Sequence, residues 1–88
     1  MEFCEYASAV KAELQKLVKG DVVIDYDAMN DIYRIYVHFL RLNVKCEYCI
    51  HRYYREGLYP STTADVLKEC IIDDVVKHFI LKGDNEND

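Results

Sequence analysis

The sequence predicts an α+β domain in which a helix, a three-stranded antiparallel sheet and a second helix pack as two layers (α-β-β-β-α). Apolar residues recur every three to four positions near both ends of the chain, as in amphipathic helices, and alternate with polar residues in the middle, as in half-buried strands. The chain has 88 residues, 51% of them hydrophobic, which suits one core and leaves no room for a second. We therefore expect a single compact domain over residues 1–82 and a disordered acidic tail over residues 83–88.

The first helix is predicted over residues 2–18. Its apolar stripe has helical spacing and consists of Phe3, Ala7, Val10, Leu14 and Leu17. Glu2 and Glu5 lie in the first turn, where negative charge interacts favourably with the helix dipole. Gly20 follows the last turn, at a position where glycine commonly ends a helix.

Two strands joined by a hairpin turn are predicted next. Residues 22–26, VVIDY, are rich in β-branched side chains, and the polar residues 27–31 are typical of a turn. The run IYRIYVHFL over residues 32–40 then alternates between apolar and polar side chains, which is the clearest strand pattern in the chain. Its apolar side consists of Tyr33, Ile35, Val37 and Phe39. Its polar side consists of Arg34, Tyr36 and His38.

A third strand is predicted over residues 44–51, after a turn near residues 40–43 where the alternation shifts by one position. The apolar side of this strand consists of Val44, Cys46, Tyr48 and Ile50. A helix over residues 46–55 is the alternative, because a short apolar run fits either structure.

The last helix is predicted after a break in the chain at Gly57 and Pro60, with Ser61 or Thr62 as its N-cap. Its main apolar stripe consists of Leu67, Cys70, Ile71, Val75 and Phe79. A second set of apolar residues widens the stripe and consists of Val66, Ile72, Val76 and Ile80. So wide an apolar surface predicts either that two elements pack on this helix or that one flank contacts a partner.

Charge is distributed unevenly along the chain, whose formal net charge is −5. Residues 1–31 carry seven acids and three bases, and residues 56–88 carry eight acids and three bases. Residues 34–55 carry five bases and one acid. A basic, tyrosine-rich centre is therefore flanked by two acidic ends, and the simplest interpretation is that they complement each other within one fold.

The motif CEYCIH over residues 46–51 raises the question of a metal site. A zinc knuckle needs two converging sulfurs and usually a second pair of ligands. On a strand, Cys46 and Cys49 point to opposite faces, and the sequence offers no second closely spaced pair. The sequence also lacks a glycine-rich phosphate loop and a nucleophile motif. We therefore expect no metal, no cofactor and no catalytic residue, and we interpret the four cysteines as buried, reduced thiols.

Two sets of residues are candidates for contact with a partner. The first set is the polar side of the sheet, because tyrosine and arginine are enriched at binding hot spots and also stack on bases and bind phosphates. It consists of Arg34, Tyr36, His38, Tyr53 and Tyr54. The second set is acidic and would imitate phosphates against a basic groove. It consists of Asp25, Asp27, Asp65, Glu69, Asp73 and Asp74.

Two resemblances bear on these candidates. The predicted order of helix, three strands and helix is similar to that of double-stranded RNA-binding domains, but their lysine-rich last helix is replaced here by STTADVLKE, with one lysine and two acids. The stretch REGLYPSTTADVLKECIIDDVVKHFILK resembles the closing segment of small acidic accessory proteins of phages and mobile elements. That group includes anti-CRISPR inhibitors, and the resemblance implies a role in blocking a host defence enzyme without assigning residues.

The function predicted from the sequence is that of a small non-enzymatic protein-binding module, a phage-type inhibitor that binds a host nucleic-acid-binding enzyme, such as a basic nuclease, and blocks its nucleic-acid site. The alternatives are a nucleic-acid-binding domain that uses the Arg/Tyr sheet face, which the net charge of −5 disfavours, and a self-associating assembly protein such as a homodimer. No apolar run reaches the roughly 18–20 residues that a membrane span needs. We expect a cytoplasmic protein, in the host cytoplasm if a phage encodes it.

Overall fold

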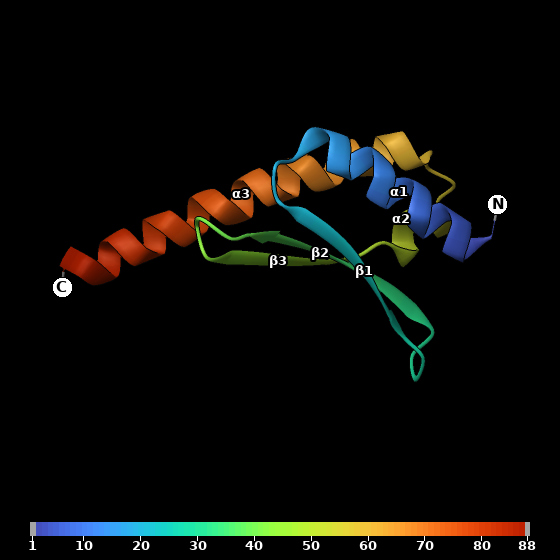
Figure 1. The fold of residues 1–88 in the computed structure, drawn as a ribbon, viewed down its shortest axis with the longest axis horizontal. Helices are drawn as coiled ribbons and strands as arrows, with labels where there is room; N and C mark the ends of the chain where they lie inside the picture. Colours follow the sequence, from blue (N-terminus) through green and yellow to red (C-terminus); the bar gives the residue numbers. More distant parts are fainter. Residues whose placement is uncertain (1, 88) are drawn as a thin grey trace.

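The computed structural model describes the backbone of residues 2–87 and the side chains of residues 2–80, and it confirms the predicted α+β order (Figure 1). Its elements are α1 (Phe3–Leu17), β1 (Asp21–Asp27), β2 (Ile32–Phe39), β3 (Val44–Cys49), α2 (His51–Arg55) and α3 (Pro60–Asn87). The three strands form one antiparallel sheet in the order β1-β2-β3, with α1 and α3 packed on one of its faces.

The larger differences from the predicted boundaries lie after the second strand. The third strand stops at Cys49, and a five-residue helix, α2, begins at His51. The strand prediction was therefore right up to Cys49, and the alternative of a helix was right from His51 to Arg55. Helix α3 begins at Pro60, ahead of the predicted caps, because the fixed φ of proline suits the first position of a helix. It continues to Asn87, past the expected end at residue 82. The prediction of a disordered tail over residues 83–88 and a domain ending at residue 82 stays a prediction.

Short turns join the strands and helices. Asp31 and Asn43 adopt positive φ angles of 53° and 52° at the ends of the two hairpin turns, a conformation that Asp and Asn tolerate better than most residues. Gly57 has a φ of 77° after α2, which glycine adopts without a steric penalty. The chain can therefore reverse direction sharply between α2 and α3.

The core lies between the sheet and the two long helices. The predicted inward side of β2 is confirmed at Ile35 and Val37, which are fully buried, with Tyr33 and Phe39 packed around them. The other buried apolar residues come from α1, β1, β3 and α3 and from Ile50 between β3 and α2: Tyr6, Ala7, Val10, Leu14, Val22, Val44, Cys46, Ile50, Ala64, Leu67 and Ile71. Because α1 and α3 contact each other as well as the sheet, the core is closed on one side of the sheet only.

Three side-chain contacts fasten the helices to the rest of the domain. The buried hydroxyls of Tyr6 in α1 and Thr63 in α3 form a hydrogen bond of 2.5 Å. Gln15 donates to the Gly20 carbonyl at 2.9 Å and accepts from the Val22 backbone N–H at 3.1 Å, so it ties α1 to the start of β1. Tyr48 in β3 donates its hydroxyl proton to Asp74 of α3 at 2.5 Å.

The Tyr6–Thr63 hydrogen bond provides a test of this packing. Thr63 is fully buried, so Thr63→Val keeps the shape of the side chain but leaves the Tyr6 hydroxyl without its partner. Tyr6→Phe leaves the Thr63 hydroxyl without its partner. We expect each single substitution to lower the free energy of unfolding by about 1–3 kcal/mol. The double variant should lose clearly less than the sum of the two, as measured by urea denaturation. Strictly additive losses would show that the two hydroxyls do not depend on each other.

Candidate protein-binding surface

No element that the structure describes covers the face of the sheet opposite the helices, and we call this face the outer face. Strand pairing places its side chains in three rows that cross β1, β2 and β3 in turn. The rows are Asp21-His38-Lys45, Val23-Tyr36-Glu47 and Asp25-Arg34-Cys49, and Asp27 extends the face beyond the last row. None of these side chains is fully buried, whereas five inward residues of the same strands are buried: Val22, Ile35, Val37, Val44 and Cys46.

The outer face combines residues that the sequence placed on two competing surfaces. Asp25 and Asp27 from the acidic set lie beside Arg34, Tyr36 and His38 from the sheet set. The face also carries three further charged residues: Asp21, Lys45 and Glu47. Four carboxylates therefore accompany two permanently charged bases, so the predicted basic centre becomes an acidic face once the strands are paired.

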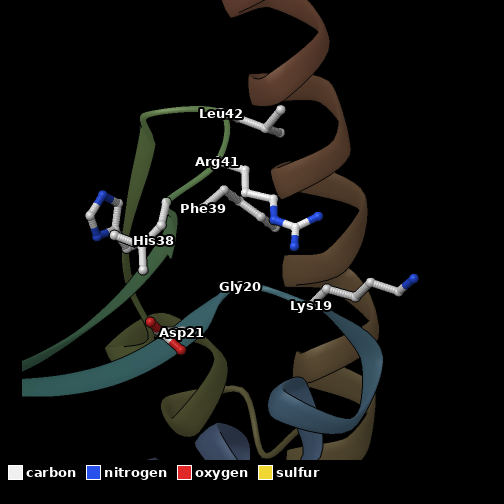
Figure 2. Close-up of a pocket in the computed structure, with 8 residues that line it drawn as sticks. Lys19, Gly20, Asp21, His38, Phe39, Arg41 and Leu42 are labelled. Carbon is white, nitrogen blue, oxygen red and sulfur yellow. The ribbon is translucent and has the colours of Figure 1, made fainter.

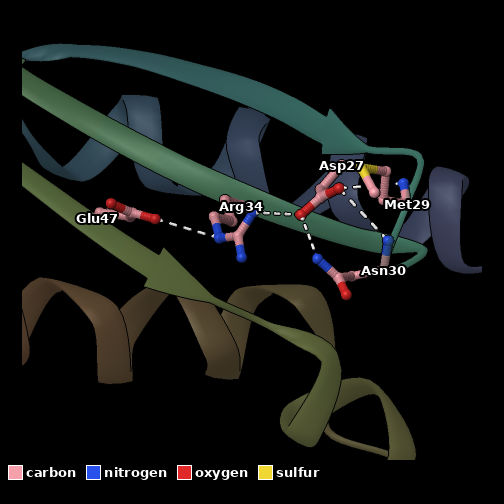
Figure 3. A network of polar contacts seen from close by, with 5 residues as sticks. All are labelled: Asp27, Met29, Asn30, Arg34 and Glu47. Atoms are coloured by element: carbon pink, nitrogen blue, oxygen red, sulfur yellow. Dashed lines mark hydrogen bonds and ion pairs between the residues drawn. The ribbon is translucent and has the colours of Figure 1, made fainter.

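Arg34 lies at the centre of this charge network (Figure 3). Its Nη1 atom is 3.0 Å from Oδ2 of Asp27, and its Nε atom is 3.2 Å from Oε1 of Glu47. The hydrogen bond to Asp27 raises the pKa of Arg34, with a smaller contribution from Glu47. Because both carboxylates come from neighbouring strands, the charge of Arg34 is neutralised within the face rather than offered to a phosphate.

Asp27 is engaged within the turn between β1 and β2. Its Oδ1 atom accepts from the backbone N–H groups of Met29 and Asn30 at 3.1 and 3.3 Å, and its Oδ2 atom accepts from the Asn30 side-chain amide at 2.8 Å (Figure 3). Hydrogen bonds from the side chains of Asn30 and then Arg34 lower the pKa of Asp27 from 3.8 to about 2. Asp27 thus shapes the hairpin turn, whereas Asp25 and Asp21 are exposed on the same face.

An aromatic and apolar centre lies among these charges. Tyr36 is half-buried, and the ammonium of Lys45 lies 4.8 Å from the centroid of its ring. Desolvation raises the pKa of Tyr36, and the carboxylate of Glu47 raises it further. Val23, directly opposite Tyr36 on β1, is 51% exposed. An apolar centre with a charged rim is the usual composition of a protein-binding surface.

The remaining acidic candidates lie on α3, away from the outer face. Asp65, Glu69 and Asp73 are exposed at intervals of four residues, and no ion pair involves them within the described side chains. Asp74 instead accepts the hydrogen bond from Tyr48. Burial, followed by that hydrogen bond, raises the pKa of Tyr48, so Asp74 serves to attach α3 to the sheet.

The placement of Tyr53 and Tyr54 on the sheet face was wrong. Both lie in α2, where helical spacing turns their rings towards the core. The Tyr54 ring stacks on Phe3 at a centroid distance of 5.0 Å and meets the edge of Tyr6 at 5.2 Å. The Arg52 guanidinium lies 4.9 Å from the centroid of the Tyr53 ring. The alternative helix over residues 46–55 was the sequence signal that indicated this arrangement.

The CEYCIH motif is divided between two elements. Cys46 is buried and Cys49 is exposed, which confirms the prediction that they point to opposite faces of a strand. His51 begins α2, with its ring 4.8 Å from that of Phe3. Within residues 2–80, no group of three or more His, Cys, Asp or Glu side chains is positioned to hold a metal ion. The expectation of buried thiols was wrong for Cys49, on the outer face, and for Cys4, on the exposed side of α1.

A hollow of about 610 Å³ lies where the α1–β1 turn meets the β2–β3 turn (Figure 2). Lys19, His38 and Arg41 all line it, together with Asp21. Figure 2 shows that Lys19 and His38 point away from each other, so the three basic side chains do not converge on one position. This hollow is therefore a poor site for a small anion.

Comparisons with protein-family models, with curated proteins and with solved structures find no match for this chain. Over the described part of the chain, no helix has both the length and the apolar character required to cross a membrane.

The hydrogen bonds of Asp27 predict how the stability of the fold depends on pH. Because its pKa is lower in the folded chain than its ordinary value of 3.8, the stability that this carboxylate contributes is complete above that value. That stability is lost as the pH falls from 3.8 towards 2. We expect a carboxyl carbon NMR titration of Asp27 to have its midpoint near 2.

Substitutions of Asn30 and Arg34, whose side chains bond to Asp27, test the cause of its lowered pKa. Asn30→Ala should raise the midpoint more than Arg34→Gln, because the Asn30 amide makes the larger contribution to the lowered pKa. A wild-type midpoint near 3.8 would contradict the hydrogen-bonded turn.

Proposed function

We propose that this domain is a non-enzymatic protein-binding module that docks the outer face of its sheet onto a basic protein. The observation that carries the proposal is the uncovered apolar centre of Val23 and Tyr36, framed by Asp21, Asp25 and Glu47. A soluble partner that buries this centre would gain hydrophobic contact. The surrounding carboxylates would favour a partner that carries Lys and Arg.

The charge of the face favours a protein over a nucleic acid as the partner. Binding to DNA or RNA depends on Lys and Arg that displace counterions from phosphates. Here Arg34 is paired with two carboxylates, and Lys45 lies over the ring of Tyr36. A phosphate backbone would meet more negative than positive charge on this face, in a chain whose net charge is −5.

A basic nucleic-acid-binding enzyme is the partner class that we propose. Such an enzyme presents a groove rich in Lys and Arg, and an acidic domain seated on it would exclude the nucleic acid. The acidic line Asp65, Glu69 and Asp73 on α3 would add long-range attraction and speed the encounter. The specific role that we propose is that of an inhibitor of a host defence enzyme acting in the host cytoplasm, the role that the resemblance to phage accessory proteins would imply.

A capture experiment tests the proposal. The immobilised domain is incubated with a nuclease-treated bacterial lysate, and bound proteins are identified by mass spectrometry. We expect basic nucleic-acid-binding proteins to be retained, and duplex DNA or RNA to compete with the domain for them. If added nucleic acid does not release the captured proteins from the domain, the proposed inhibition is contradicted.

Two charge-reversal variants locate the surface that docks. Asp21→Lys with Asp25→Lys reverses two exposed acids of the outer face, and Asp65→Lys with Glu69→Lys makes the same change in charge on α3. We expect the outer-face variant to lose most of the captured protein and the α3 variant mainly to slow its association. The opposite result would assign docking to α3 and reject the outer face.

Direct binding to nucleic acid should be weak. Because Arg34 is neutralised and acids surround it, we expect a dissociation constant for labelled duplex DNA or RNA of about 100 μM or weaker at physiological salt, measured by fluorescence anisotropy. Arg34→Glu should leave this value unchanged within error. A submicromolar complex that Arg34→Glu abolishes would support the nucleic-acid-binding alternative.

A further inference from the structure

Helix α3 carries an apolar face that no other part of the chain covers among residues 2–80, whose side chains the structure describes. Leu67 and Ile71 are only 1% and 2% exposed, whereas Ile72, Val76, Phe79 and Ile80 are 46%, 50%, 46% and 57% exposed. Ile72 and Val76 lie on another side of α3 from Ile71 and Val75, which pack on the core. Figure 1 shows that the far end of α3 also continues past the end of the sheet. Four large apolar side chains on one side of a projecting helix form a contiguous patch, which marks an association site more often than free surface.

An apolar groove adjoins this patch. It has a volume of about 440 Å³ and is lined by Leu17 at the end of α1, Leu42 in the β2–β3 turn, and Ile71, Ile72 and Val75 of α3. Leu17 and Leu42 are themselves 38% and 42% exposed. The patch and the groove together offer both a protruding ridge and a recess, the two features that an interface between identical surfaces requires.

Asp73 and Lys77 determine what can cover the patch. They lie one helical turn apart on the same flank of Ile72, Val76 and Ile80, and neither forms an ion pair within the described side chains. A helix that packs here is best matched if it carries a base beside Asp73 and an acid beside Lys77. A second α3 running in the opposite direction meets this requirement, because the order of the two charges is then reversed.

We infer that two copies of this chain associate through α3 as an antiparallel pair that crosses at Val76. Residues Ile72, Val76 and Ile80 form a ridge with four-residue spacing, which packs against an identical ridge at a crossing angle of about 50°. Ile72 of one copy then lies against the partner's Ile80. The Phe79 ring reaches the partner's groove beside Ile72 and Val75, and each Asp73 lies beside the partner's Lys77.

The positions of Asp73 and Lys77 favour an antiparallel pair over a parallel one. In a parallel pair the flank that carries Asp73 and Lys77 would face the opposite flank of the partner, so these charges would not meet each other. The antiparallel pair converts the same residues into two complementary contacts. The outer face of each sheet remains free in this arrangement, so the dimer does not depend on the proposed docking function.

Sedimentation equilibrium tests the dimer on the purified chain. We expect a mass that rises with concentration from 10.4 kDa towards twice that value. Val76→Glu should hold the mass at that of the monomer, because it places two carboxylates together at the crossing point. Val23→Glu is the matched control, since Val23 has nearly the same exposure (51% against 50%) but lies on the sheet. It should dimerise like the wild type.

A charge exchange distinguishes a second copy from other occupants of the patch. Asp73→Lys and Lys77→Asp should each weaken dimerisation by roughly tenfold, because each brings like charges together across the pair. The variant with both substitutions restores opposite charges and should dimerise within about threefold of the wild type. Circular dichroism checks that every variant is folded. A monomer mass for the wild type at all concentrations, or a double variant no better than the singles, would overturn the inference.

Discussion

The packing of α1 against α3 over a single face of the sheet is the constraint on which the rest of the structure depends. A three-stranded sheet cannot close on itself, so it needs another layer to bury its inward side chains. The hydrogen bond between Tyr6 and Thr63 lies in this helix pair and is fully shielded from water. The fully buried alanines, Ala7 and Ala64, come from the same two helices and add no bulk between the layers.

Because both long helices are used on one side, the outer face must satisfy its own charges. It does so through ion pairs across the strands, with Arg34 between Asp27 and Glu47. Such exposed pairs contribute little to stability. Their main effect here is to fix the positions of charged groups around Tyr36 and to leave a surplus of carboxylates. The surface is acidic because the pairing of β1 with β2 places Asp21, Asp25 and Asp27 of the acidic first segment beside the basic residues of the middle segment.

The alternation of residues in β2 was sufficient to predict which of its side chains face the core, because a strand has only two sides. It was not sufficient to predict that Asp25 and Arg34 would share a row, since that depends on the pairing of β1 with β2 through the turn at Asp27. Tyr53 and Tyr54 were misplaced for a related reason. Their burial depends on Phe3 and Tyr6 from a distant part of the chain, which local periodicity does not report.

The domain has two different exposed surfaces, the apolar patch on the second part of α3 and the charged outer face of the sheet. The first half of α3 is stabilised by the core, whereas an isolated helical segment as short as its second half is marginal in water and gains most from packing an apolar face. Association there would bury Ile72, Val76 and Phe79 and would depend mainly on hydrophobic contact. The outer face of the sheet is rich in charge and suits rapid encounter with an oppositely charged surface. Since the two surfaces share no residue, the domain can use each without giving up the other.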